Sequence, residues 1–211
     1  MIIVGAKGFA KEVLEVIHQN KELDNLVFYD DVTINLPDLL YDKFPILRNE
    51  SQVKKYFETI GKEFTIGIGD PKLRWDLYLK FLKIGGVYTS TISKTSSIGN
   101  FGNKIEEGVN IMQKVVITND VTIKRGVIIN QLTSIGHDVF IDEFAEICPN
   151  VSISGNVSIG SKTFIGTGAI ILPKLNIGSN VIIAAGSVVC NNIPDNVMVA
   201  GVPAVIKKHL V

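Results

Sequence analysis

Aliphatic residues in the second half of the chain recur every six positions without interruption. A period of six drifts against the 3.6 residues of a helical turn, but it is even, so it keeps one side-chain direction along extended segments. Short strands joined by tight turns fit this spacing, and hexapeptide repeats are typical of parallel β-solenoids. The pattern therefore predicts a solenoid with an inward column of Ile105, Ile111, Ile117, Ile123, Ile129, Ile135, Ile141, Ile147, Ile153, Ile159, Ile165, Ile171, Ile177, Ile183 and Val189.

A second set of small or β-branched residues lies four positions after these aliphatic residues. We expect both sets to point inward, because isoleucine can fill the interior of a prism while the smaller residue fits a crowded corner. If three hexads form one coil, residues eighteen positions apart stack on one another. The second inward column is then Val109, Val115, Val121, Val127, Thr133, Val139, Ala145, Val151, Val157, Thr163 and Ala169.

The start of the chain has a different pattern, which predicts a small α/β domain. Residues 1–4 form an apolar strand, a turn with Gly5 and Gly8 follows, and residues 10–20 carry apolar side chains at helical spacing. A second strand over 26–29 ends in an acidic pair, Asp30 and Asp31. This order is typical of sites that hold a phosphate at a helix N-terminus and a ribose or base on the acid. A turn that merely packs the helix on the strand is the alternative interpretation.

The rest of this region predicts a third strand over 64–68 and a helix over 73–83, and the domain closes near Tyr88. It is too small for a full dinucleotide fold, so a mononucleotide or a nucleotide-sugar fits better than NAD. We therefore divide the chain into an α/β nucleotide-sugar-binding domain (1–90), a β-helix (91–194) and a C-terminal loop and tail (195–211).

Composition narrows the possible partners. The chain has 211 residues, 46% hydrophobic content and 21 basic against 21 acidic side chains, enough for one sizeable core and a small second domain. The basic residues are scattered, so no nucleic-acid partner is expected. No apolar run reaches the roughly 18 residues that cross a bilayer, and no signal peptide is recognisable, so we expect no membrane partner and a cytoplasmic location. Cys148 and Cys190 should lie on different sides of the prism as free thiols.

A series of short motifs points to a known family. The motifs are Gly5-Ala-Lys-Gly8-Phe9 with Glu12-Val13, Tyr29-Asp30-Asp31, Gly67-Ile-Gly69-Asp70, Asn130, Ile135-Gly-His137-Asp138, Pro149, Ser154-Gly155-Asn156, Ala185-Gly186-Ser187-Val188 and Ala200-Gly201-Val202-Pro203-Ala204. Nearly the whole chain resembles the bacterial sugar acetyltransferases of the left-handed β-helix superfamily, which include nucleotide-amino-sugar N-acetyltransferases and sialic acid O-acetyltransferases. The resemblance implies a left-handed solenoid, a homotrimer with active sites between subunits, acetyl-CoA as donor and a histidine as general base.

His137 is the only histidine within the repeats. An outward histidine is, taken alone, more often a surface residue than a base. The stacking scheme, however, places Asn119 on one side of the imidazole and Gly155 on the other, which leaves room for a thioester. Acetyl transfer requires removal of the nucleophile's proton, and histidine is the most effective single side chain for this near pH 7. We expect His137 to be the base, with Asp138 orienting its ring.

The resemblance also implies contacts with the two substrates. Acetyl-CoA would lie along the groove between neighbouring solenoids and contact Glu146, Gly155, Thr167, Ala185 and Gly201. The acceptor would contact Gly5, Gly8, Asp30, Asp31, Gly69 and Asn130. The chain departs from the family pattern twice, since relatives often have a histidine at the position of Glu146 and a basic residue at that of Val205.

The expected function is acetyl-CoA-dependent acetylation of a sugar, and the amino group of a nucleotide-linked amino-sugar in surface polysaccharide or glycan biosynthesis is the favoured acceptor. Acetylation of a sugar hydroxyl and a non-catalytic trimer that binds a sugar nucleotide are the alternatives. A zinc enzyme on the same solenoid would need three histidines per site, so no metal is expected. A homotrimer should cover the outward apolar residues, for which we take Ile129, Phe140, Phe144 and Ile182.

Overall fold

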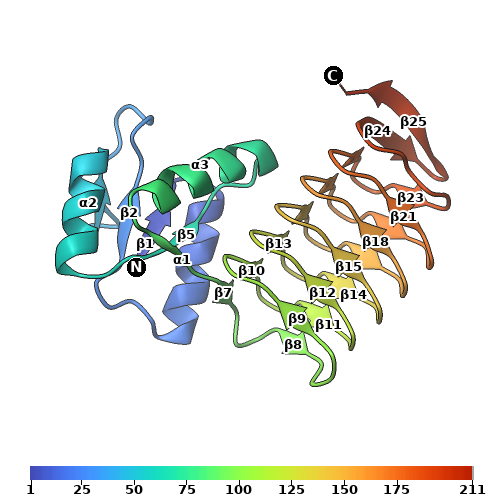
Figure 1. Cartoon of the computed structure of the whole chain (residues 1–211), viewed down its shortest axis with the longest axis horizontal. Coiled ribbons are helices and arrows are strands. Elements are labelled where there is room, and N and C mark those ends of the chain that lie inside the picture. The colour runs from blue at the N-terminus through green and yellow to red at the C-terminus, as the bar shows by residue number, and fades with distance from the viewer. Residues whose placement is uncertain (211) are drawn as a thin grey trace. The chain divides into compact units, whose positions relative to one another are not determined.

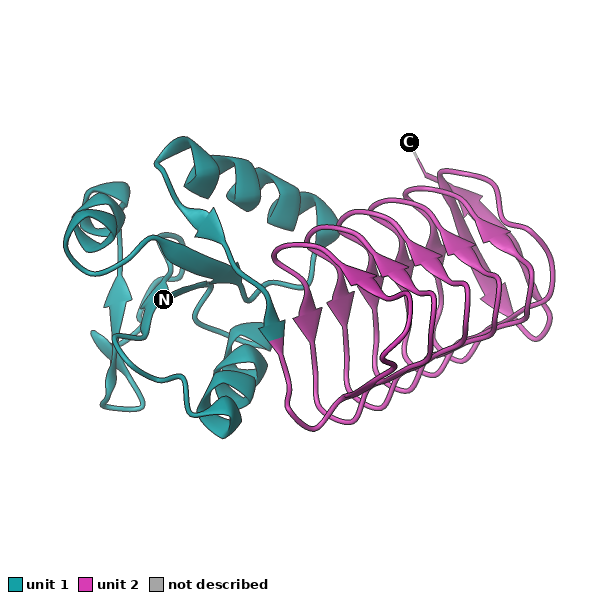
Figure 2. Ribbon diagram, turned by 60° about the horizontal axis from the view of Figure 1, so that its bottom comes forward, with its two compact units in different colours: residues 1–91 teal, residues 92–211 magenta. Residues whose placement is uncertain are grey.

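The computed structural model describes residues 1–210 and divides the chain into two compact units, residues 1–91 and 92–211 (Figure 2).

The second unit is a three-sided coil of very short parallel strands (Figure 1). One side contains β7 (Thr91–Ile92), β10 (Asn110–Ile111), β13 (Ile128–Ile129), β16 (Glu146–Ile147), β19 (Phe164–Ile165) and β22 (Ile182–Ile183), followed by β24 (Val197–Gly201) and β25 (Ala204–His209). The second side contains β8 (Ser97–Ile98), β11 (Val116–Ile117), β14 (Ser134–Ile135), β17 (Ser152–Ile153), β20 (Ile170–Ile171) and β23 (Val188–Val189). The third side contains β9 (Lys104–Ile105), β12 (Thr122–Ile123), β15 (Phe140–Ile141), β18 (Ser158–Ile159) and β21 (Asn176–Ile177).

The register of these sheets confirms that three hexads form one coil. Ile141 pairs with Ile123 in the coil before it and with Ile159 in the coil after it, so stacked residues are eighteen positions apart. Both predicted inward columns are buried, with Ile105 in the first coils only partly so. Each strand contributes one inward isoleucine or valine and one outward residue, which is why two-residue strands are long enough to define the fold.

Two of the residues expected to lie exposed on the prism are instead buried. Ile129 belongs to the inward column, and Phe144 is covered because its ring packs over Gly126 of the preceding coil. Ile182 is half-buried, and Phe140 is exposed as expected. The prediction was wrong for Ile129, which is the inward residue of β13, and for Phe144, because a corner glycine opens space into which a ring from the next coil can fold.

The C-terminal segment also differs from the expected loop and tail. It forms a hairpin in which β24 continues the first side of the prism beside β22 and β25 returns antiparallel to β24. Val197 and Val199 are fully buried, so the segment follows a period of two after the hexad repeat has ended. The core therefore extends past residue 195, and Gly201 lies in the hairpin.

The first unit is an α/β domain with strand order β3-β4-β2-β1-β5-β6 (Figure 1). Its elements are β1 (Ile2–Val4), α1 (Phe9–Asn20), β2 (Val27–Tyr29), β3 (Leu39–Leu40), β4 (Phe44–Leu47), α2 (Glu50–Thr59), β5 (Glu63–Ile66), α3 (Pro71–Lys83) and β6 (Val87–Tyr88). Only β3 is antiparallel to its neighbour. Helix α1 covers one face of the sheet, and α2 and α3 cover the other, as right-handed crossovers in opposite directions require (Figure 2).

The sequence located β1, α1, β2, β5 and α3 to within a few residues but did not indicate β3, β4, α2 or β6. Helix α2 begins at a cap in which the Asn49 side chain accepts a hydrogen bond from the Gln52 backbone, and only Val53, Tyr56 and Phe57 of this helix are buried. So few apolar positions give a weak periodic signal. Helix α3 begins two residues earlier than expected, because Asp70 caps it and Pro71 occupies its first position.

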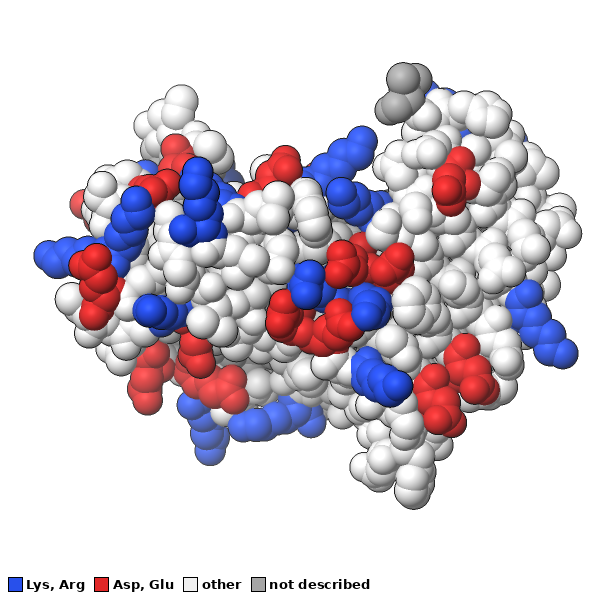
Figure 3. Space-filling model, in the orientation of Figure 1, with Lys and Arg blue, Asp and Glu red and all other residues white. Residues whose placement is uncertain are grey.

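On the face of the molecule drawn in Figure 3, no large region carries a single charge. Lys and Arg side chains alternate with Asp and Glu side chains on the face drawn in Figure 3. Within residues 1–210, no helix combines the length and apolar character needed to span a bilayer.

Candidate active site

Corner turns hold the candidate catalytic residues at one edge of the prism. This edge, which we call the His137 edge, is formed by residues 119–120, 137–138, 155–156 and 173–174 between the second and third sides. The backbone amide of Asn156 donates to the His137 carbonyl at 2.9 Å, and that of Lys174 donates to the Gly155 carbonyl at 3.1 Å. Asp138 has φ of 57°, the left-handed conformation that turns the chain at each corner. The stacking of coils therefore fixes the height and spacing of these residues.

His137 and Asp138 contact each other, as expected. The imidazole Nδ1 lies 2.6 Å from Asp138 Oδ2, and the two side chains are 64% and 55% exposed. In the neutral imidazole whose Nδ1 donates to the Asp138 carboxylate, Nε2 keeps its lone pair. This is the tautomer that a general base needs, and the open position of the ring leaves Nε2 accessible.

Gly155 provides the floor beneath the imidazole. A Cβ atom placed on Gly155 would lie 2.7 Å from both Cε1 and Nε2 of His137. Such a separation is too short for two carbon atoms, so the ring can lie in this position only above a glycine. The predicted stacking of His137 on Gly155 is confirmed by this contact.

Asn119 does not complete the site in the expected way. Its side-chain oxygen accepts a hydrogen bond from the Phe101 backbone amide at 3.3 Å, and a Cβ atom on Gly99 would lie 2.3 Å from the same oxygen. The amide is thus directed toward the preceding coil. Asn119 supports the corner below His137.

A second edge carries two of the predicted donor residues, Thr167 and Ala185. This edge, the Thr167 edge, is formed by residues 131–132, 149–150, 167–168 and 185–186 between the first and second sides. Thr167 and Ala185 are exposed on neighbouring coils, and the Gly186 amide donates to the Thr167 carbonyl at 2.9 Å. The amide of Gly201 approaches the same coil, donating to Ser187 Oγ at 3.3 Å. Small residues along this edge leave the backbone accessible.

Glu146 and Asn130 lie on the first side of the prism. Glu146 is the outward residue of β16, and Asn130 is 5% exposed and donates from Nδ2 to the Ile147 carbonyl at 3.1 Å. Burial and, to a smaller extent, the Glu146 carboxylate together raise the pKa of the neighbouring Cys148 thiol to about 12, against hydrogen bonds from Thr167. A thiol with so high a pKa is a poor nucleophile at neutral pH, so Cys148 is not a candidate for the acyl carrier.

Both cysteines are free, as expected, and Cys190 follows a strand on a different side of the prism from Cys148. Within residues 1–210, no group of three or more His, Cys, Asp and Glu side chains is arranged to hold a metal ion.

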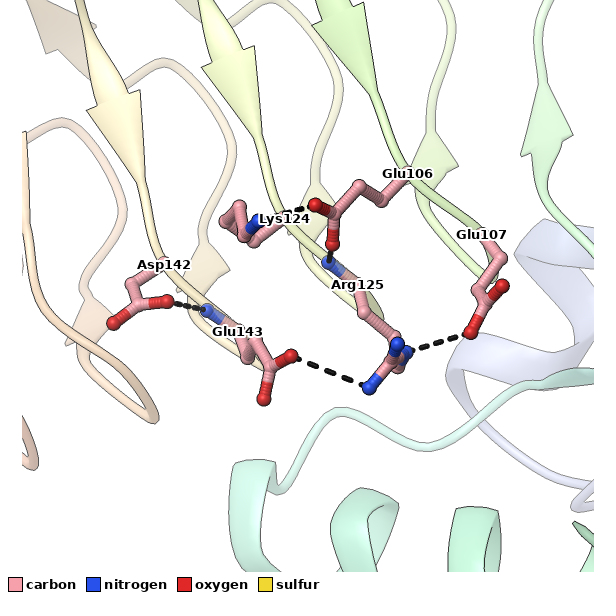
Figure 4. A network of polar contacts seen from close by, with 6 residues as sticks. All are labelled: Glu106, Glu107, Lys124, Arg125, Asp142 and Glu143. Carbon is pink, nitrogen blue, oxygen red and sulfur yellow. Dashed lines mark hydrogen bonds and ion pairs between the residues drawn. The ribbon is translucent and has the colours of Figure 1, made fainter.

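The third edge, between the third and first sides of the prism, carries stacked ion pairs. Lys124 pairs with Glu106, and Arg125 pairs with Glu107 at 2.7 Å and with Glu143 at 3.3 Å (Figure 4). Each pair joins residues eighteen positions apart, so opposite charges stack on successive coils. Such half-exposed pairs contribute little individually. They give Glu143 a structural role.

In the α/β unit, the predicted acceptor residues follow the carboxyl ends of three adjacent parallel strands. Gly5 follows β1 with φ of 106°, Gly8 precedes α1 with φ of 39°, and Gly69 lies after β5. No side chain caps the first turn of α1. The carboxyl edge of parallel strands is where open α/β sheets bind ligands, so the arrangement fits an anionic ligand.

Asp30 and Asp31, at the end of β2, differ in their contacts. Asp30 is 8% exposed and accepts hydrogen bonds from the backbone amides of Val32 and Thr33 and from Thr33 Oγ1. Asp31 is more exposed and accepts bonds from Tyr29 and Lys80 through Oδ2. Burial alone would raise the pKa of Asp31, but the bonds from Lys80 and Tyr29 outweigh it and lower that pKa.

Comparisons with known proteins match both units. Residues 1–81 match the PglD N-terminal domain, and residues 156–191 match the bacterial transferase hexapeptide model of six repeats. A mutant of perosamine N-acetyltransferase from Caulobacter crescentus, in complex with CoA and GDP-perosamine, is 28% identical over 98% of this chain and 96% of its own, with a TM-score of 0.89. The acetyltransferase domain of PglB from Neisseria gonorrhoeae FA1090, in complex with acetyl coenzyme A, is 28% identical over 98% of both chains, with a TM-score of 0.86. The chain is therefore similar over nearly its whole length to hexapeptide-repeat sugar acetyltransferases.

The chain therefore has the fold that the resemblance implied, a left-handed parallel β-helix preceded by a Rossmann-like α/β domain. Within one chain, the structure brings His137, Asp138 and Gly155 together at one edge and Thr167 and Ala185 together at another. It does not bring these two groups together, because they lie at opposite ends of the second side of the prism.

Sequence reasoning missed one functional contact of the chain. Lys80 lies 49 positions after Asp31, and its ammonium group reaches that carboxylate at 2.8 Å. Helical spacing placed residue 80 on a predicted helix but gave no indication of where the helix would pack. Only the crossover of α3 over the sheet creates the pair.

Proposed function

We propose that this protein transfers the acetyl group of acetyl-CoA to the amino group of a nucleotide-linked amino-sugar, with His137 as the general base. The observation that carries the proposal is the exposed imidazole above Gly155, held through Nδ1 by Asp138 with Nε2 available. The perosamine N-acetyltransferase complex, with CoA and GDP-perosamine, and the PglB complex with acetyl coenzyme A support the choice of substrates.

In the proposed reaction, the amine nitrogen attacks the thioester carbonyl carbon while His137 Nε2 takes the proton that the nitrogen loses. Asp138 stabilises the resulting imidazolium through Nδ1. The carbon–sulfur bond then breaks, and the imidazolium returns its proton to the departing CoA thiolate. The products are the acetamido sugar and CoA, and the histidine ends in its starting state.

Acetyl-CoA is proposed to lie along the Thr167 edge. Gly168 and Gly186 have open space where a side chain would stand, so an extended chain such as the pantetheine arm can approach the backbone there. We assign the donor contacts to Glu146, Gly155, Thr167, Ala185 and Gly201. The acceptor contacts are assigned to Gly5, Gly8, Asp30, Asp31, Gly69 and Asn130.

The decisive test measures thiol release from acetyl-CoA against a panel of nucleotide-linked amino-sugars, the corresponding hydroxyl sugars and sialic acid. We expect release only with the amino-sugars, accompanied by an N-acetyl product in mass spectrometry. If only a hydroxyl acceptor gives thiol release, the nucleophile in the reaction above is an alcohol and not an amine. No release with any acceptor would favour a sugar-nucleotide-binding protein without catalysis.

We further propose that the active protein is a homotrimer. The base lies on one edge and the donor residues Thr167 and Ala185 lie on another edge of the same chain, so a neighbouring chain can complete each site. Exposed apolar residues on the second and third sides, Val116, Phe140 and Ile170, supply surface for such contacts. Light scattering should give about three times the 23.0 kDa of one chain. A mass of one chain would contradict both the trimer and the shared site.

A further inference from the structure

The two acidic residues at the end of β2 are distinguished by what their oxygens contact. Asp30 uses Oδ1 for the amides of Val32 and Thr33 and Oδ2 for the Thr33 hydroxyl, so both of its oxygens close the loop that follows. Asp31 receives both of its side-chain donors on Oδ2. Its Oδ1 takes part in neither bond, and the side chain is 34% exposed.

The donors that hold Asp31 come from rigid parts of the α/β unit. Tyr29 is 2% exposed, its hydroxyl donates to Asp31 Oδ2 at 2.6 Å, and its ring packs edge-on against Phe81 with centroids 5.1 Å apart. Lys80 Nζ lies 2.8 Å from the same carboxylate oxygen, 2.7 Å from the Tyr29 hydroxyl and 4.9 Å from the centre of the Tyr29 ring. Two charge-assisted bonds and a ring contact thus fix one rotamer of Asp31.

We propose that Lys80, with Tyr29, is a positioning residue that directs Asp31 Oδ1 toward the nucleoside of the acceptor, and that Asp30, the other acid assigned to the acceptor, acts by shaping the loop that follows β2. This inference rests on the proposed function, because it concerns the acceptor of that reaction. The hydroxyls of a ribose and the N–H groups of a base are the donors that a fixed, acceptor-only carboxylate recognises.

The charge state of the triad agrees with this role. Burial alone would lower the pKa of Lys80, but the hydrogen bonds to Asp31 and Tyr29 raise it, while burial raises the pKa of Tyr29. The pKa of Asp31 is lowered, so the carboxylate stays ionised as the pH falls to and below the ordinary range for an aspartate. Without Lys80, the burial of Asp31 is opposed only by the hydrogen bonds from Tyr29 and from the Asp31 backbone, so the pKa of Asp31 should be higher than in the wild type.

Other charged groups near Lys80 belong to the two helices of the same face. A cavity of about 470 Å³ between α2 and α3 is lined by Glu50, Lys54, Asp76, Leu79, Lys80, Lys83 and Ile84. Lys54 is paired with Glu50 at 2.7 Å. On the loop side, Arg48 donates to the backbone carbonyls of Leu36 and Pro37. Lys83 is therefore a suitable control, since it lines the same cavity without contacting Asp31 in any bond described above.

The test is calorimetric titration of the full-length protein with GDP and with UDP. For the nucleotide that the wild type binds more tightly, Lys80→Met and Asp31→Asn should each raise Kd about tenfold, because one oriented charge-assisted hydrogen bond is lost. Lys83→Met should leave Kd unchanged, and Lys80→Arg should restore part of the affinity. In Lys80→Met, the loss of binding at acidic pH should begin at a higher pH than in the wild type.

Acetyl transfer separates this inference from the proposed function. In Lys80→Met, KM for the nucleotide-sugar should rise while KM for acetyl-CoA stays unchanged, and the melting temperature should match that of Lys83→Met. If the wild type is active and the Lys80→Met variant keeps the wild-type Kd and pH dependence, the proposed role of Lys80 is overturned and the proposed function stands. A wild type that binds neither GDP nor UDP also overturns it, whereas absence of acetyl transfer counts against the proposed function.

Discussion

Replacement of His137 by alanine should lower kcat by roughly 10² to 10⁴ while leaving KM for acetyl-CoA nearly unchanged. The variant loses the group that takes the amine proton, but the proposed donor contacts lie mainly on the Thr167 edge. The side chain is 64% exposed and its removal opens no core cavity, so the melting temperature should stay within a degree or two of the wild-type value, about what small surface changes cause. Steady-state kinetics with both substrates varied measures the effect.

Two companion variants show whether the position of the imidazole matters. Gly155→Ala places a methyl group where His137 now lies, so the ring must move and kcat should fall by up to about 10²-fold, as misplaced catalytic groups do. His18→Ala removes a similarly exposed histidine from α1 and should leave the kinetics unchanged. Near-normal turnover of His137→Ala would mean that another group is the base.

Replacement of Ile159 by alanine should destabilise the β-helix by about 2–5 kcal/mol, since it removes buried methyl groups from the middle of the inward column. Ile159 is fully buried and pairs with Ile141 and Ile177 on the coils before and after it. The neighbouring coils are held at a fixed spacing by backbone hydrogen bonds, so they cannot close around the cavity. Urea denaturation followed by circular dichroism measures the change.

The graded variant Ile159→Val is the matched control for this prediction. It removes a single methyl group and should cost about 0.5–1.5 kcal/mol. Ser158→Ala changes the adjacent, outward residue of β18 and should have little effect. Equal losses for the alanine and valine variants of Ile159 would contradict the cavity explanation.

The hexad repeat determined the β-helix from sequence because its signal is local and periodic. Every coil repeats the same pattern of an inward aliphatic residue, an inward small residue and a corner. The pairing of Ile141 with Ile123 and Ile159 could therefore be predicted by counting eighteen residues along the sequence. The same arithmetic placed His137 above Gly155, and the contact between them followed. The repeat ends near residue 195, so the hairpin of β24 and β25 could not be predicted from the hexad spacing.

Corner positions were less predictable than strand positions. Phe144 was expected outside because its hexad position points away from the column, but the space above Gly126 on the preceding coil admits its ring. Asn119 was expected beside His137, but its side chain bonds to Phe101 in the coil below. At a corner, the left-handed turn allows a side chain to pack on either of two coils. The spacing of residues along the chain does not indicate which of the two it is.

In the α/β unit, the sequence determined the order of strand, turn and helix, and it placed the acceptor residues after the strands. It did not distinguish Asp30 from Asp31, because the two are adjacent and chemically identical. The tertiary structure decided between them: α3 crosses the sheet and brings Lys80 to Asp31, while Asp30 turns back to Thr33. A contact between residues 49 positions apart depends on how a helix packs, and packing is settled by the whole core rather than by any local pattern.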